Sequence, residues 1–183
     1  MTEPTTGSVR SKDGTEIGYQ SIGQGPGLVI VHGGMEWGRS HLQLATELSD
    51  TCTVFLPDRR GRGRSGPYGE GDDVLDVEVE DLDALPAATG ARQVLGVSSG
   101  AIIVLRAATM LPALERVVAF EPPLPVHPSF RPEEWMPLFD RRIEEDDEIG
   151  ALTTALRGAQ LGPPILSRIP RRVVEFLTRV LTA

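Results

Sequence analysis

Apolar residues in the first two thirds of the chain form short runs, and the stretches between these runs have helical spacing. A continuous run such as Leu28–Val31 predicts a strand buried on both faces, because a half-buried strand alternates apolar and polar residues. Thr15–Ser21 reads instead as an edge strand. The full set of predicted strands is Ser8–Arg10, Thr15–Ser21, Leu28–Val31, Thr51–Leu56, Gln93–Gly96 and Val117–Phe120.

Between the later strands, apolar residues recur every three or four positions, which predicts amphipathic helices. These helices are expected near Leu42–Leu48, Asp73–Ala88 and Ser99–Leu111. Strands separated by single helices imply βαβ crossovers. We therefore expect an α/β fold whose sheet is mostly parallel and carries helices on both faces.

The pattern changes after Glu121, where four prolines fall within seven residues (Pro122, Pro123, Pro125 and Pro128). Proline fixes φ and restricts the residue before it, so this stretch is expected to be extended. Beyond it only helical spacing remains, over Pro132–Ile143, Ile149–Gln160 and Pro170–Leu181. The sequence thus predicts two parts, a core over residues 1–122 and a helical segment over residues 123–183.

Composition narrows the classes of function. A net charge of -8 disfavours nucleic acids and anionic membranes as partners, because a protein that binds either of them needs a basic surface. The apolar runs are too short to span a bilayer, which takes about 20 residues, and Met1–Lys12 lacks the apolar part of a secretory signal. Cys52, the single cysteine, allows no internal disulfide and no cysteine-based zinc site. We expect a cytoplasmic protein with no metal.

The strongest chemical signal is Gly96-Val97-Ser98-Ser99-Gly100, which matches G-x-S-x-G. An apolar strand leads into it and an apolar helix leads out, as a nucleophile elbow requires. In such an elbow Ser98 would adopt a strained backbone conformation and expose its hydroxyl above the sheet. The alternative is an ordinary turn between strand and helix in which Ser98 caps the helix.

A second signal, His32-Gly33-Gly34, ends an earlier apolar strand. An oxyanion hole takes one backbone N–H from the residue after the nucleophile and another from such a loop. The expected donors are the amides of Ser99 and Gly34, with Gly33 beside them in the substrate-binding loop. His32 itself is expected to be a structural histidine.

Together with Asp58-Arg59-Arg60-Gly61-Arg62-Gly63-Arg64-Ser65, which matches D-x-R-G-x-G-x-S, these motifs resemble the α/β-hydrolase superfamily in their order along the chain. The resemblance covers about residues 15–122. It implies an α/β-hydrolase fold and an esterase-like serine hydrolase, in which Ser98 attacks a small-molecule ester or related acyl substrate. It also implies that residues 123–183 form a helical cap.

The same loop fits the dinucleotide pattern G-x-G-x-x-G over Gly61–Gly66, but Pro67 follows where a helix would have to begin. No NAD and no other cofactor is therefore expected. The arginines of the loop are expected to be solvated or paired with acidic residues of the following helix.

The family order also calls for an acid and then a late histidine, whereas the histidines here are His32, His41 and His127. No strand is predicted after residue 121, so the sheet is expected to be truncated after its sixth strand, without the C-terminal part of the fold. Glu121, at the end of that strand, is a candidate for the acid; alternatively, it anchors the start of the cap. His127 is a weaker candidate for the base.

A sheet that ends at Val117–Phe120 presents unpaired N–H and C=O groups along its edge. Self-association through this edge, as a homodimer, is therefore expected. Two alternatives to a hydrolase stay open. One is a catalytically inactive relative that serves as a binding or dimerisation module, and the other is a family member in which Ser98 assists proton transfer without a cofactor.

Overall fold

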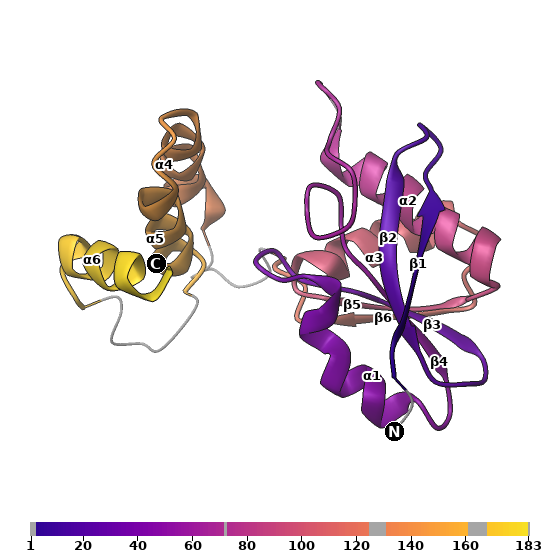
Figure 1. Cartoon of the computed structure of the whole chain (residues 1–183). Helices are drawn as coiled ribbons and strands as arrows, with labels where there is room; N and C mark the ends of the chain where they lie inside the picture. The colour runs from indigo at the N-terminus through magenta and orange to yellow at the C-terminus, as the bar shows by residue number, and fades with distance from the viewer. Residues whose placement is uncertain (1–2, 72, 125–130, 161–167, 183) are drawn as a thin grey trace. The chain divides into compact units, whose positions relative to one another are not determined.

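A computed structural model describes residues 3–71, 73–124, 131–160 and 168–182 of the chain (Figure 1). Contacts divide the chain into two compact units, Met1–Pro123 and Leu124–Ala183. The first unit holds a six-stranded sheet, and the elements described in the second are all helices. Among the described residues, no helix has both the length and the apolar character that crossing a bilayer requires.

The sheet of the first unit has the strand order β1-β2-β4-β3-β5-β6. The strands β3, β4, β5 and β6 run parallel to one another, whereas β1 pairs antiparallel with β2 and β2 antiparallel with β4. The strand bounds are Thr5–Arg10 (β1), Glu16–Ile22 (β2), Gly27–Val31 (β3), Thr53–Pro57 (β4), Gln93–Val97 (β5) and Arg116–Phe120 (β6). The predicted α/β fold with a mostly parallel sheet is thereby confirmed.

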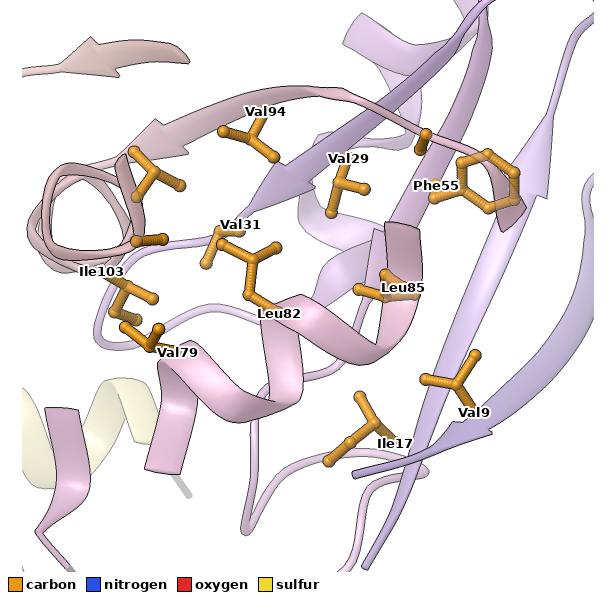
Figure 2. Close-up of a cluster of buried hydrophobic side chains, with 13 residues drawn as sticks. Val9, Ile17, Val29, Val31, Phe55, Val79, Leu82, Leu85, Val94 and Ile103 are labelled. Carbon is orange, nitrogen blue, oxygen red and sulfur yellow. The ribbon is translucent and has the colours of Figure 1, made fainter. Parts of the chain in front are cut away.

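Side chains alternate across the central strands, and each face of the sheet has its own core. On one face, the helices α2 (Val74–Thr89) and α3 (Ser99–Met110) pack against β3 and β5. Figure 2 shows Leu82 of α2 pointing toward Val31 of the sheet, and Ile103 of α3 beside Val79 of α2. On the other face, α1 (Leu42–Leu48) follows the short 3-10 helix η1 (Gly38–His41), and its Ala45 packs against the sheet.

The sequence placed one strand wrongly. Thr15–Ser21 was expected at the edge of the sheet, but β2 lies between β1 and β4, and β1 forms the edge. The reason is that β2 pairs at its far end with β4, through partners such as Ile22 and Val54, and this long-range pairing leaves no local signal.

The other edge of the sheet is β6, as predicted, and no strand follows Phe120 in the described residues. Its side chains alternate in burial. Val117 and Ala119 pack against the core under α3, whereas Val118 and Phe120 on the opposite face are each 55% exposed.

The second unit consists of α4 (Pro132–Glu144), α5 (Glu148–Gly158) and α6 (Arg171–Thr182). Helices α4 and α5 make the closest contacts, and Trp135 and Phe139 of α4 meet edge to face with ring centroids 6.3 Å apart. On α6, Val174 is buried while Phe176 is exposed. Among the described residues of this unit, the buried apolar side chains are Ala151 and Val174, both small.

Candidate active site

Ser98 lies at the sharp turn between β5 and α3. Its backbone has φ 52° and ψ −119°, a region that costs a non-glycine residue about 1–3 kcal/mol and persists only where the surroundings enforce it. Part of that enforcement is a 2.9 Å hydrogen bond from the Ser98 N–H to the carbonyl of Phe120 in β6. The Ser98 hydroxyl makes no capping bond to the helix, so the structure does not support the alternative in which Ser98 caps α3.

The glycines on either side allow this turn to pack closely. A Cβ on Gly96 would come within 2.3 Å of the Gly100 carbonyl oxygen, and one on Gly100 within 2.3 Å of the Val31 carbonyl oxygen. Both approaches are too close for any side chain. The G-x-S-x-G pattern thus has a physical cause here, which is the contact between the start of α3 and the ends of β3 and β5.

The loop after β3 lies directly against this turn. A Cβ built on Gly33 would be 3.4 Å from Ser98 Cβ, and one on Gly34 would be 3.6 Å from Ser99 Oγ. Residues from two separate motifs are therefore brought to the same place. Neither the Gly34 nor the Ser99 N–H has a hydrogen-bond acceptor among the described residues, and Ser99 is the first residue of α3, where the helix dipole favours negative charge.

The Gly33 N–H, in contrast to those of Gly34 and Ser99, has a hydrogen-bond acceptor in the described part of the chain. It donates to Glu36 Oε2 at 2.7 Å, and the same oxygen lies 3.2 Å from His41 Nε2. Gly33 thus stands in the loop beside Ser98, as expected, but its N–H is already occupied in this structure.

A buried arginine connects the loop with the turn. Arg59 Nη1 donates to the Gly33 carbonyl at 3.4 Å and to Ser99 Oγ at 2.9 Å. Its other nitrogens form two bonds of 2.6 and 2.5 Å with the carboxylate of Glu78, which also accepts a bond from the Tyr68 hydroxyl. Burial and the bond to Glu78 raise the pKa of Tyr68 above its usual range. The sequence predicted that arginines of the loop are solvated or pair with the following helix. It did not predict that Arg59 also connects to Gly33 and Ser99.

The bonds of His32 explain why it does not act as a base. It is fully buried, its Nε2 accepts the Arg59 N–H at 3.1 Å, and its Nδ1 lies 2.8 Å from the Gly33 carbonyl. The proton therefore sits on Nδ1. Burial, with a smaller contribution from the charge of Arg59, lowers the pKa of His32 to about 4. The imidazole is neutral at pH 7 and structural, as the sequence suggested.

Glu121 follows β6, and its backbone has a φ of 48°. Because Val97 pairs with Phe120 in the parallel register, Ser98 and Glu121 both come one residue after the last pair and at the same edge of the sheet. The exposed Glu121 carboxylate makes no hydrogen bond with any described residue, so an anchoring role is not supported there. His127 lies outside the described residues.

Within the described ranges, no three His, Cys, Asp or Glu side chains are grouped so that they could hold a metal ion. The run of five acidic residues Glu144–Glu148 extends from the last residue of α4 to the first residue of α5. In the structure its member Asp147 accepts the Gly150 N–H at the start of α5 and pairs with Arg142.

Comparison with known proteins places the chain in a family. A family profile described as the alpha/beta hydrolase family matches residues 28–181. The crystal structure of an alpha/beta hydrolase from Sphaerobacter thermophilus is 31% identical and superposes with a TM-score of 0.78, covering 96% of this chain and 71% of that one. The bottromycin epimerase BotH is 26% identical with a TM-score of 0.69, covering 97% and 72% of the two chains.

A curated relative is the cis-3-alkyl-4-alkyloxetan-2-one decarboxylase of Shewanella oneidensis, which is 36% identical over 77 residues. That match takes in 41% of this chain and spans 24% of the decarboxylase. The family profile, by contrast, extends over both units. From the profile, the superposed structures and the turn at Ser98, we conclude that the chain belongs to the alpha/beta hydrolase family.

Proposed function

We propose that the protein is a serine hydrolase that cleaves an ester or a related acyl bond, with Ser98 as its nucleophile. The observation that carries this proposal is the left-handed backbone of Ser98 at the turn between β5 and α3. Strain of this kind is retained where it serves a function, and here it keeps the hydroxyl of a partly accessible serine free of the helix it precedes.

In the proposed reaction, Ser98 Oγ attacks the carbonyl carbon of the substrate. The negative charge that develops on the carbonyl oxygen is held by the Gly34 and Ser99 amides, both of which have no acceptor among the described residues. Loss of one such donor raises a barrier by about 3–4 kcal/mol. The alcohol then leaves, and water releases the acid from the acyl-enzyme.

A base has to accept the Ser98 proton, and the carboxylate of Glu121 is the candidate acid that would orient it. Glu121 shares with Ser98 the position just past the last paired residues of β5 and β6. We propose that the second unit, Leu124–Ala183, is the helical cap segment of the protein. The substrate is proposed to be a small neutral acyl compound. The decarboxylase relative is named for an oxetan-2-one, which is itself a cyclic ester.

The test is labelling of the purified chain with a fluorophosphonate, measured by intact mass. The parent and Ser99→Ala are expected to gain the mass of one phosphonyl group, and Ser98→Ala is expected to gain none. Ser99→Ala is the matched control, because it removes the neighbouring hydroxyl and keeps the backbone N–H. Absence of labelling in a parent that is folded by circular dichroism would contradict the proposal.

A second candidate is a relative without hydrolytic activity that serves as a binding or dimerisation module. It is favoured by the outer face of β6, where Val118 and Phe120 are each 55% exposed beside an unpaired strand edge. Such edges promote pairing with a second chain. A dimer in sedimentation velocity that Val118→Lys converts to monomer would support this candidate. A monodisperse monomer over the whole concentration range would argue against it.

A third candidate is proton transfer, in which Ser98 donates a hydrogen bond and forms no acyl-enzyme. It is favoured by the names of two relatives, an epimerase and a decarboxylase, since neither describes a hydrolysis. Turnover of p-nitrophenyl esters by the parent that is lost in Ser98→Ala would support hydrolysis over this alternative.

A further inference from the structure

The second unit contains a hollow of about 400 Å³ between the end of α4, the start of α5 and the face of α6. This volume is in the range of pockets for small ligands. Its polar lining consists of four guanidinium groups and two carboxylates, from Arg142, Arg171, Arg172, Arg179, Asp147 and Glu175. We call this hollow the arginine pocket.

The charge of the arginine pocket is opposite to that of the chain as a whole. Four guanidinium groups against two carboxylates leave a surplus of two positive charges, whereas the chain carries -8. A surplus of this size attracts an anion locally and matches a group that carries two negative charges.

Two of the guanidinium groups are only partly satisfied by their partners. Arg142 donates through Nη1 to Asp147, and Arg171 donates through Nε to Glu175 at 2.7 Å. Even so, Arg142 Nε and Arg171 Nη2 are buried and have no hydrogen-bond partner among the described residues. Both atoms are covered by the protein, so these two guanidinium groups would act on an anion in the hollow through their charge and not through these donors.

The other two guanidinium groups belong to Arg172 and Arg179 on α6. Both are exposed, and neither forms an ion pair or side-chain hydrogen bond with any described residue. Arg172 and Arg179 can therefore turn toward a ligand without losing a partner in the described part of the unit. Guanidinium is the group that best matches the oxygens of phosphate, because its planar fork donates two parallel hydrogen bonds.

We propose that the arginine pocket binds the phosphoryl group of a small soluble molecule, such as a phosphate monoester or a diphosphate. Its two negative charges balance the surplus, and its oxygens accept from the exposed guanidinium groups of Arg172 and Arg179. This site lies within the second unit and does not depend on the proposed reaction at Ser98.

The surroundings of the pocket favour a small ligand over an extended polyanion. Asp147 is part of a run of five acidic residues, Glu144–Glu148, between α4 and α5. A nucleic acid or an anionic membrane laid across the pocket would meet this run, and like charges would repel it. A single phosphoryl group that enters the hollow avoids most of these carboxylates.

The test is isothermal titration of the whole chain with pyrophosphate in a buffer of low ionic strength. We expect saturable binding to one site, weakened by added sodium chloride. Arg179→Gln and Arg172→Gln are each expected to weaken binding about tenfold, as loss of a charge-assisted bond predicts. Arg141→Gln is the matched control, because Arg141 is an exposed arginine next to Arg142 that does not line the pocket; its affinity is expected to equal that of the parent.

Several results would overturn the proposal. Absence of saturable binding by a folded chain is one, and an equal loss of affinity in Arg141→Gln and Arg179→Gln is another. Succinate carries two negative charges on planar carboxylates, and a phosphate monoester such as phenyl phosphate carries close to two near pH 7, so equal affinity for succinate and phenyl phosphate would refute recognition of a phosphoryl group. Binding to phosphatidic acid vesicles without binding to pyrophosphate would assign the site to a lipid. Fluorophosphonate labelling of Ser98 is unaffected by any of these results, so the two proposals fail separately.

Discussion

Arginine has opposite surroundings in the two units. In the first unit, Arg60 is 1% exposed and donates to Asp81 and Asp13, while Arg59 forms two bonds with the buried carboxylate of Glu78. In the arginine pocket of the second unit, Arg142 and Arg171 each keep a buried donor that has no partner in the described part of the chain. Charges matched within the chain hold a fold together, whereas unmatched ones are available to a ligand.

Removal of Arg60 is expected to change the stability of the first unit more than any other substitution considered below. Because its carboxylate partner Asp81 is buried, Arg60→Ala leaves a charge without compensation, and we expect the free energy of unfolding to fall by about 4 kcal/mol. Urea denaturation followed by circular dichroism measures this. Arg64→Ala, in the same loop but exposed, is the matched control and should unfold near the parent midpoint. A loss of less than about 1 kcal/mol in Arg60→Ala would contradict the assigned role.

Acidification is expected to have the next largest effect, through His32. Its pKa is about 4 in the folded chain and about 6.5 when unfolded. The unfolded chain therefore takes up a proton first, and stability present above pH 6.5 is lost as the pH falls toward 4. The loss between pH 7.5 and pH 5 is expected to be about 2 kcal/mol.

The pH range separates this effect from that of the carboxylates. The bond to Arg60 holds the pKa of Asp13 below its ordinary value of 3.8, so its stabilising effect is present at pH 5 and is lost only at more acidic pH. An NMR titration of the His32 ring identifies the group directly. A midpoint near 6.5 would show that His32 is not responsible.

The second unit can be made to resemble the first by adding a carboxylate to the arginine pocket. Ile149 lines this pocket, and Ile149→Glu places an acid among the arginines. Compared with Ile149→Gln, we expect about 1 kcal/mol more stability and about tenfold weaker pyrophosphate binding. Thermal unfolding and calorimetry of the pair measure both. Equal stability and equal affinity in the two variants would mean that these guanidinium groups are not short of acceptors.

The smallest effect is expected for an ion pair at the surface of the first unit. Lys12 lies 2.6 Å from Glu80, but the Lys12 side chain is 77% exposed. Water and salt screen the attraction within such a pair, and the entropy lost when the two side chains become ordered opposes it. Lys12→Ala should therefore unfold at the same urea concentration as the parent. A clearly lower urea midpoint would show that exposed ion pairs stabilise this chain as buried ones do.

Much of the fold could be predicted because its signals are local. Six strands were predicted from local patterns, and the structure has a strand at each of these positions. The edge position of Thr15–Ser21 was wrong because strand order depends on pairing between distant segments, here β2 with β4. The same reasoning applies to the turn at Ser98. Its glycines, Gly96 and Gly100, are only four positions apart, so the local motif was enough to predict the geometry.

The cluster around Arg59 was harder to foresee, since its members come from several elements. One signal was available in the helix α2. Glu78 lies three residues after Leu75 and four before Leu82, within the apolar stripe of the helix. An acidic residue on a buried face requires a partner, and the arginines of the preceding loop are the nearest source. Nothing comparable in the sequence indicated which arginines of the second unit would lack partners.

The bond between the Ser98 N–H and the Phe120 carbonyl has a consequence for the order of folding. The left-handed conformation of Ser98 relaxes unless neighbouring strands hold it. The strand β6 holds it here, because the Phe120 carbonyl accepts the hydrogen bond from the Ser98 N–H. In a chain whose β6 has not yet docked beside β5, the backbone of Ser98 is therefore not held at a positive φ. We therefore expect the turn to form only when β6 has docked beside β5, and the proposed reactivity of Ser98 would then report this pairing.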